Sequence, residues 1–193
     1  MAICSKCRRR LIFWISLTCL SIGTGLLLDI GFFKTNSFAL FVRLIGIAGI
    51  ILAHFLLKRT GKLLGRFGDC ELWGWSTKLI TRNVYGCVRH PHHLGVGMFM
   101  TFLGLAIGYP ITFTVIAVTQ WSWVFLFVIL IEEKECLEKF GNDYREYSRI
   151  TPMFFGNPVC IVKELLKIAE EPQKQGQPRE GRKLIKTHPR PGQ

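Results

Sequence analysis

A chain of 193 residues has room for one domain, and 49% of its residues are hydrophobic. The hydrophobic residues stand in long blocks, which excludes a soluble globular domain and indicates an integral membrane protein. The formal net charge of +12 comes from Lys and Arg outside these blocks. Because such charges orient helices and bind anionic headgroups, we expect the lipid bilayer as a partner and no nucleic acid.

The first two apolar blocks predict an amino-terminal transmembrane hairpin over residues 1–57. Residues 11–28 are uncharged and long enough to span, and three Arg precede them. A basic start before an apolar run also describes a signal peptide, but this run is longer than a signal core and lacks a clear cleavage site. We therefore expect a retained helix. Residues 38–57 form the second predicted span, in which Arg43 can extend to the interface and His54 is interpreted as an interfacial histidine.

The middle of the chain predicts a second hairpin. A basic connection is expected over residues 58–93, followed by a third span over residues 91–109. Gly108-Tyr109-Pro110 is typical of a tight turn. The fourth span covers residues 111–131, and its helix is expected to continue to Phe140. The predicted fold class is all-α: an integral membrane helical bundle of about four transmembrane helices, with amphipathic helices at its carboxyl end.

The last part of the chain predicts amphipathic helices and a tail. Large apolar side chains recur at spacings of three and four, which predicts one apolar face on a helix along the membrane surface: Leu137, Phe140, Tyr144 and Tyr147. Gly141 is expected to interrupt this helix. A final amphipathic helix is expected over residues 158–168, and residues 171–193 are predicted to be a disordered basic tail. Residues 58–170 then form the functional region between the amino-terminal hairpin and the tail.

The distribution of Lys and Arg predicts the topology. Most of these residues lie at the amino terminus, in the 58–93 connection and in the tail, whereas the turns at 29–37 and 108–110 carry one, Lys34. Basic residues are retained on the cytoplasmic side of membrane proteins. We therefore predict a multi-pass protein with both termini in the cytoplasm.

The seven cysteines show no spaced framework, and we expect reduced thiols. Cys4 and Cys7 form a lone C-x-x-C pair. It would suit half a zinc site or lipidation, but no second pair follows at zinc-finger spacing, so we interpret it as incidental.

Two polar clusters flank the third and fourth spans. The first runs from Arg89 to Gly97, and the second from Glu132 to Glu135. Because the tight turn makes the two spans an antiparallel hairpin, both clusters should lie at its cytoplasmic end. We therefore expect His90 to lie close to Glu132, although the two residues are about 40 positions apart.

These clusters suit a small, polar, cationic ligand. Pro91 fits the first turn of a helix, whose free N–H groups can bind a carboxylate. Gly95 and Gly97 let a ligand or another helix approach the backbone. Glu132 and Glu133 accept hydrogen bonds from hydroxyls and an amine, although a solvated helix end would look similar.

A metal site is not expected. Adjacent residues of a helix point about 100° apart, so one helix cannot easily present His92 and His93 together with His90.

Two motifs carry a family resemblance. The first is Arg89-His90-Pro91-x-x-Leu94-Gly95, and the second is Glu132-Glu133-x-x-x-Leu137-x-x-Phe140-Gly141-x-x-Tyr144-x-x-Tyr147. In this order and at this separation they resemble the isoprenylcysteine carboxyl methyltransferase family, which is related in pattern to the phospholipid N-methyltransferases. The resemblance covers about residues 77–155.

The resemblance implies a membrane methyltransferase that uses S-adenosylmethionine and a lipid-like or prenylated acceptor from the bilayer. Carried over onto this sequence, it implies these cofactor contacts: His90, Pro91, Gly95, Gly97, Glu132 and Glu133. We add Arg89 and His93 as candidate catalytic residues, since a histidine can take a proton from an amine or thiol acceptor and an arginine can pair with a carboxylate.

The sequence also departs from the family pattern. His93 stands where the motif usually has Tyr, and residues 125–131 lack the Arg that is suited to the carboxylate of a prenylcysteine. A phospholipid or a thiol therefore remains open as the acceptor. Two other functions remain open as well. One is an NADPH-dependent membrane reductase, because some sterol reductases share an Arg-His-Pro element, and the other is a non-catalytic adaptor that works through the basic tail.

Overall fold

The computed structural model describes residues 5–67 and 78–170, and within these ranges it contains helices and no strand. The elements, in chain order, are α1 (Ser5–Leu26), η1 (Leu27–Phe32), α2 (Leu40–Phe67), α3 (Val84–Cys87), α4 (Pro91–Ile107), α5 (Pro110–Phe127), η2 (Val128–Glu132), α6 (Glu133–Ile150) and α7 (Pro158–Glu170). Elements η1 and η2 are short π-helical segments. The predicted all-α class is confirmed.

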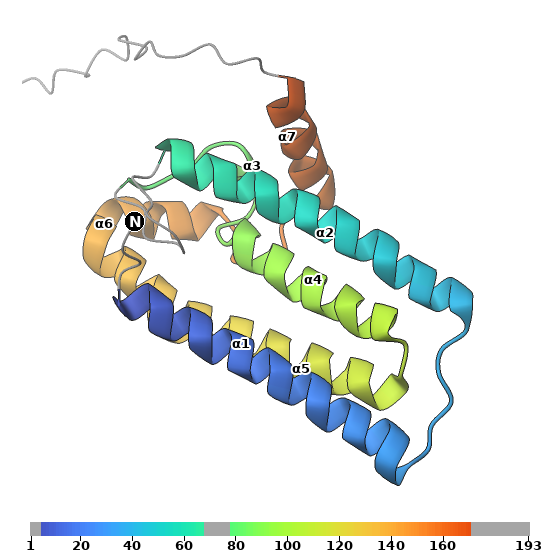
Figure 1. The fold of residues 1–193 in the computed structure, drawn as a ribbon. Coiled ribbons are helices and arrows are strands. Elements are labelled where there is room, and N and C mark those ends of the chain that lie inside the picture. The colour runs from blue at the N-terminus through green and yellow to red at the C-terminus, as the bar shows by residue number, and fades with distance from the viewer. Residues whose placement is uncertain (1–4, 68–77, 171–193) are drawn as a thin grey trace, which may run out of the picture.

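Four apolar helices form a row in the order α2, α4, α5, α1 (Figure 1). The central pair, α4 and α5, is the predicted hairpin. Its tight turn is confirmed, because Gly108 adopts a left-handed conformation with φ of +90° and Pro110 begins α5. Helices α1 and α2 lie on opposite sides of this pair, so the two helices of the amino-terminal segment each pack on the central hairpin.

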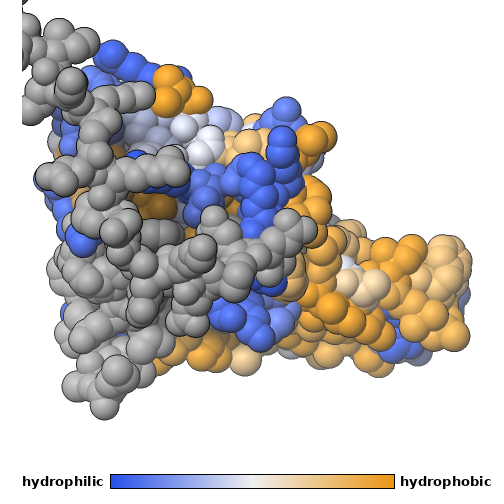
Figure 2. Space-filling model, turned by 90° about the horizontal axis from the view of Figure 1, so that it is seen from above, coloured by the Kyte–Doolittle hydropathy of each residue, from blue (hydrophilic) through white to orange (hydrophobic). Residues whose placement is uncertain are grey.

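Three stretches are long and apolar enough to cross a membrane: Arg8–Phe32, Leu40–Leu64 and Pro110–Ile150. Helix α4 is apolar but has 17 residues. At 1.5 Å per residue its length is about 25 Å, slightly less than a typical hydrocarbon core. Many large apolar side chains are more than half exposed, among them Ile12, Leu20, Phe32, Leu40, Ile51 and Val118. Figure 2 shows hydrophobic residues over the half of the bundle away from the hydrophilic end, as a lipid-facing surface requires.

Helix α2 is longer than the predicted span. It continues beyond residue 57 to Phe67, so the expected 58–93 connection begins about ten residues later. Lys and Arg are good helix formers, and the extension buries Leu63 against Val84, Tyr85 and Val88. Hydropathy marks the part of a helix inside the membrane but not the part that packs on protein beyond it.

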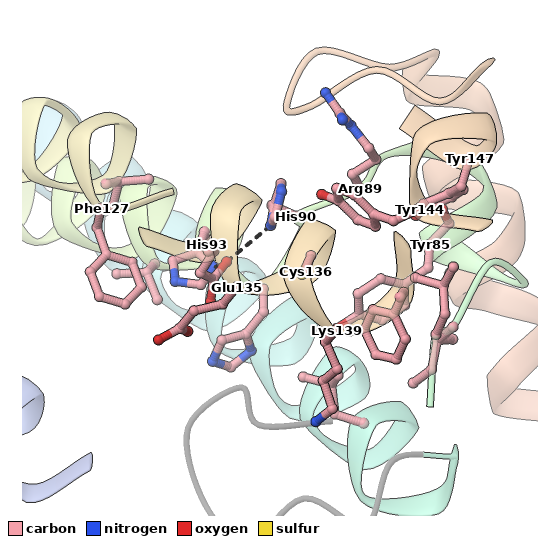
Figure 3. Close-up of a pocket in the computed structure, with 18 of the residues that line it drawn as sticks. Tyr85, Arg89, His90, His93, Phe127, Glu135, Cys136, Lys139, Tyr144 and Tyr147 are labelled. Atoms are coloured by element: carbon pink, nitrogen blue, oxygen red, sulfur yellow. Dashed lines mark hydrogen bonds and ion pairs between the residues drawn. The ribbon is translucent and has the colours of Figure 1, made fainter. Parts of the chain in front are cut away.

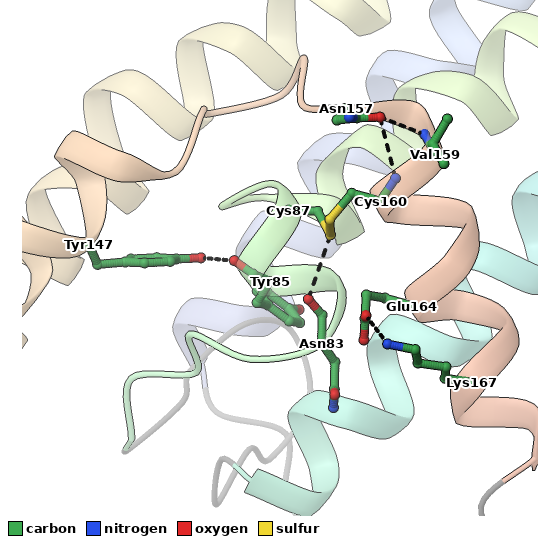
Figure 4. The surroundings of a disulfide bond; sticks show 9 residues. All are labelled: Asn83, Tyr85, Cys87, Tyr147, Asn157, Val159, Cys160, Glu164 and Lys167. Carbon is green, nitrogen blue, oxygen red and sulfur yellow. Dashed lines mark hydrogen bonds and ion pairs between the residues drawn. A yellow bond between two sulfur atoms is a disulfide. The ribbon is translucent and has the colours of Figure 1, made fainter.

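A disulfide contradicts the expectation of reduced thiols. Cys87, the last residue of α3, is bonded to Cys160 in α7, across 73 positions of sequence (Figure 4). Ile161 and Leu165 of α7 pack on the cluster that contains Leu63 and Val84, and this packing brings the two sulfurs together. No local spacing rule would pair cysteines so far apart. Cys4 and the predicted tail, residues 171–193, lie outside the described residues.

Helix α6 is divided at Gly141, as predicted. The φ and ψ of Gly141 are +54° and −125°, a conformation that residues with a side chain rarely adopt. The predicted single apolar face is wrong in part, because Tyr144 and Tyr147 turn into the protein and are buried. The final amphipathic helix is confirmed as α7, and Asn157 Oδ1 accepts hydrogen bonds from the N–H groups of Val159 and Cys160 at its start.

At the end of the bundle near the Gly108 turn, a buried carboxylate links η1 to the start of α5. Asp29 in η1 accepts hydrogen bonds from the backbone N of Thr112 at 2.6 Å and of Ile111 at 3.2 Å, which are free donors at the start of α5. It also accepts from the hydroxyls of Thr35 and Thr112. Asp29 thus fixes α1 to the central hairpin, a role that the sequence analysis did not identify.

Asp29→Asn should lower the free energy of unfolding by about 1–3 kcal/mol, because an NH2 group would then face a backbone N–H inside the protein. The measurement is unfolding in detergent micelles, and Asp143→Asn is the matched control because Asp143 is exposed on α6. Equal stability of the two variants would contradict the capping role.

Candidate functional site

The two predicted polar clusters meet at the end of the central hairpin opposite Asp29. His90 precedes α4, Glu132 ends η2 and Glu133 begins α6. Nδ1 of His90 lies 3.0 Å from Glu132 Oε2, and its Nε2 lies 2.7 Å from Glu133 Oε1. The predicted proximity of His90 and Glu132 is therefore confirmed.

The backbone around His90 is held by the segment that follows α6. The N–H of Arg89 donates to the carbonyl of Pro152 at 2.9 Å, and that of His90 to Met153 at 3.2 Å. Pro91 then begins α4, where its missing N–H leaves no donor unsatisfied. Extended residues before α4 thus position the imidazole, and the π-helical segment η2 sets the direction of the two glutamates, a distortion often found at functional sites.

Glu133 receives three donors. Besides His90, Arg89 NH1 lies 3.1 Å from Oε2, and the hydroxyl of Tyr144 donates to Oε1 at 2.7 Å. In a straight helix, positions 11 residues apart are separated by about 16 Å, beyond the reach of a tyrosine. The break at Gly141 is what lets Tyr144 fold back onto the first turn of α6.

The geometry implies that His90 is protonated. Both ring nitrogens face carboxylates, which accept hydrogen bonds and donate none, so both nitrogens must carry hydrogen. Burial, which leaves 7% of the side chain exposed, lowers the pKa of His90. The hydrogen bonds and charges of Glu132 and Glu133 outweigh burial and hold this pKa above its ordinary value of 6.5.

The other two histidines point in different directions. His93 Nδ1 lies 3.3 Å from Glu132 Oε2, and the ring of His93 stacks on Phe127 with centroids 5.5 Å apart. His92 turns to α2, where its Nδ1 is 3.1 Å from the hydroxyl of Thr60. The ligand atoms of His90, His93 and Glu132 lie within 4.8 Å of one another, close enough to bind a metal ion together. The absence of a metal site therefore stays a prediction.

A cavity of about 450 Å³ opens beside this network. Figure 3 shows His93, Phe127 and Glu135 at one end of it, and Tyr85, Tyr144 and Tyr147 at the other. His90 and Glu132 contribute to its wall between these ends, and Glu133 stands behind them. We call the end next to α1 and α5, which Phe127 lines, the aromatic end; the opposite end, lined by the three tyrosines, lies under the second half of α6 (Figure 3).

Four of the predicted site residues do not line the cavity: Glu133, which stands behind the wall, and Pro91, Gly95 and Gly97. Pro91 is buried at the first turn of α4. A Cβ on Gly95 would come within 2.9 Å of the side chain of Leu57, and one on Gly97 within 2.8 Å of Trp121. The two glycines let α4 pack closely on α2 and α5, so the geometry favours the packing interpretation over cofactor contact.

Sequence reasoning missed other residues of the cavity. Arg10 and Trp14 come from α1, and Cys136 and Lys139 from α6. Arg10 served only as evidence for topology, and nothing in the sequence indicates that it meets Glu135, 125 positions later. The motif that contains Glu133 and Tyr144 did indicate that Tyr144 belongs to the site. The sequence analysis instead interpreted Tyr144 as part of an apolar face along the membrane.

The charge on His90 predicts a pH dependence. Its stabilising contribution should be fully present below about pH 6.5, the ordinary pKa of an unfolded histidine, and should be lost as the pH rises through the higher pKa of the folded state. Wild-type protein should therefore lose unfolding free energy as the pH rises from about 6.5 through the raised folded-state pKa of His90, and His90→Gln should lack that part of the loss. Parallel curves for the two proteins would contradict a protonated His90.

The comparisons with known proteins agree with this site. The sequence model described as phospholipid methyltransferase matches residues 35–143, which is more than half of the chain. The match includes α2, the central hairpin and both glutamates, and it leaves α1 and α7 outside. No curated protein and no solved structure gives a significant match. The fold, the paired motifs and the extent of this match lead to one conclusion: the chain belongs to the phospholipid methyltransferase family of membrane methyltransferases.

Proposed function

We propose that this protein transfers a methyl group from S-adenosylmethionine to a lipid-like acceptor in the membrane. The observation that carries the proposal is the cavity at the end of the central hairpin, which has the buried His90 and the partly buried Glu132 in its wall. Its volume of about 450 Å³ is within the range of small-molecule sites. The family match covers Arg89, His90, Glu132 and Glu133 of this network.

The donor set suits S-adenosylmethionine, which carries a carboxylate, an amine, hydroxyls and a positive sulfonium. Within the described residues, Arg89 Nε is buried and has no hydrogen-bond partner, so it is a donor available to a ligand carboxylate. Glu132 can accept from an amine or hydroxyl. We propose that Arg89, His90 and Glu132 hold the cofactor while Glu133 and Tyr144 position His90. Bound there, the cofactor supplies an electrophilic methyl group.

His93 is the residue we propose for proton transfer. It lies at the end of the cavity that Phe127 and Glu135 also line (Figure 3), and Glu132 and Phe127 fix its ring. An amine or thiol acceptor loses a proton as it is methylated, and an imidazole can take it, whereas a carboxylate acceptor needs no base. Alignment in a water-poor cavity supplies the rest of the catalysis.

The acceptor is proposed to enter from the bilayer, because the cavity lies among membrane-spanning helices. An aminophospholipid and a prenylated cysteine both fit this requirement, and a small water-soluble thiol does not. The family match favours a membrane acceptor without choosing between the first two.

The termini are proposed to face the cytoplasm. The structure places the start of α1, the end of α2 and the start of α4 at one end of the bundle (Figure 1), together with Arg8, Arg9, Lys58 and Arg59. Tags at residues 1 and 193 should be protected from protease added to sealed cells. A tag between Asn36 and Ser37, at the opposite end, should be cleaved. Cleavage of either terminal tag would overturn this orientation.

The proposed activity predicts transfer of label from methyl-labelled S-adenosylmethionine to lipid by purified protein in membranes. An aminophospholipid, a farnesylated cysteine and a soluble thiol should be offered in parallel, and oxidation of NADPH measured alongside. Glu132→Gln should keep the shape of the side chain but weaken cofactor binding by about 1–3 kcal/mol, because a charged hydrogen bond is lost.

Glu146→Gln is the matched control, because Glu146 is exposed on the same helix and does not line the cavity. Unchanged cofactor affinity in a folded Glu132→Gln protein would contradict the site. Preference for the soluble thiol would overturn delivery from the bilayer, and NADPH oxidation without methyl transfer would overturn the activity itself.

A further inference from the structure

Helix α1 lies outside the family match, yet it forms one wall of the cavity. Arg10 and Trp14 both line the cavity from this helix. They lie at its aromatic end, where Trp123 and Phe127 of α5 are also exposed to the cavity. The chemistry of this end is therefore set by residues that the family motifs do not include.

Arg10 forms a bidentate contact with Glu135. NH2 of Arg10 lies 2.6 Å from Glu135 Oε1, and NH1 lies 3.5 Å from Oε2. The two side chains are 25% and 35% exposed, so water or a ligand can reach both. Ion pairs with this exposure contribute little stability, which means that an incoming anion can replace the glutamate at small cost.

The guanidinium of Arg10 also stands over an aromatic ring. Its central carbon is 5.3 Å from the centroid of Phe127. Phe127 lies in the stretch where the sequence analysis looked for an arginine suited to an acceptor carboxylate and found none. The structure supplies that charge from α1, at the same place in the fold.

The other arginine of the cavity is less available. Arg89 is 11% exposed and donates to Glu133 within the His90 network, which we have proposed as part of the cofactor site. Arg10 instead faces the end that continues toward lipid. Trp123 packs with tilted rings against both Phe127 and Phe13, at centroid distances of 5.6 Å and 4.6 Å, and the Phe13 side chain is half exposed. A continuous aromatic surface therefore connects the cavity to the bilayer face.

We infer that Arg10 is a specificity-determining residue that binds an anionic group, a phosphate or a carboxylate, on the polar head of the acceptor. The ligand oxygens replace Glu135 on the planar guanidinium, which matches both groups in a bidentate manner. The aromatic wall of Trp14, Trp123 and Phe127 holds the adjoining apolar chain. This inference rests on the proposed function only in naming the bound amphiphile as the methyl acceptor.

The test measures binding without methyl transfer. Two probes carry the anion, oleoyl lysophosphatidic acid and N-acetyl farnesylcysteine, and each has a neutral match, monooleoyl glycerol and the farnesylcysteine amide. Binding to the full chain in a neutral maltoside detergent is followed by tryptophan fluorescence, because Trp14 and Trp123 line the cavity. The anionic probe that carries the preferred group, phosphate or carboxylate, should bind more tightly than its neutral match.

Three variants separate recognition from structure. Arg10→Gln should weaken binding of the anionic probe by about tenfold and leave its neutral match unaffected, as expected for a lost charged hydrogen bond. Arg9→Gln removes the same charge from an exposed site on the same turn and should have no effect. Glu135→Gln should keep or strengthen binding, because it releases Arg10 from its partner.

Equal losses in Arg10→Gln and Glu135→Gln would show a structural ion pair and overturn the inference. No preference for an anionic probe, or an equal loss in Arg9→Gln, would overturn it as well. Preference for the phosphate or for the carboxylate probe identifies the source of the anion. Charge-dependent binding in a protein that transfers no methyl group would leave Arg10 as an anion-binding residue and refute the proposed function alone.

Discussion

The placement of His90 between two carboxylates is the contact on which the rest of the site depends. A buried charge is unfavourable unless it is paired, and here one imidazolium pairs with two acids from the other half of the hairpin. The contact joins the start of α4 to the junction of η2 and α6. Removing either partner would leave an uncompensated charge, so the three side chains define one geometry for this end of the bundle.

The break at Gly141 adds the second half of α6 to this network. It turns the second half of α6 back over the hairpin, so that Tyr144 reaches Glu133 and Tyr147 reaches the carbonyl of Tyr85. The segment after α6 then supplies Pro152 and Met153 to hold the backbone at Arg89 and His90. The site is thus built by a chain that passes it three times, before α4, after α5 and after α6.

Hydropathy and turn chemistry predicted most of the fold. The four apolar helices follow from uninterrupted apolar runs, and the turn at Gly108-Tyr109-Pro110 made the proximity of His90 and Glu132 deducible. The contacts that were missed join distant segments: Asp29 with Thr112, Cys87 with Cys160 and Arg10 with Glu135. Each depends on which elements pack against one another in space, and a single sequence does not contain that information. Gly95 and Gly97 show a different limit, because the same glycine pattern is compatible with ligand binding and with close helix packing.

The order of the helices also separates two parts of the site. The residues proposed for the cofactor come from the matched segment, at the start of α4 and the start of α6. The wall next to the bilayer comes from α1, which lies outside that segment and packs on α5. A change in α1 can therefore alter the charge and shape offered to an acceptor without disturbing His90, Glu132 or Glu133. Under the proposed function, one cofactor site combined with a variable wall from α1 is a physical route by which a single membrane fold can act on chemically different acceptors.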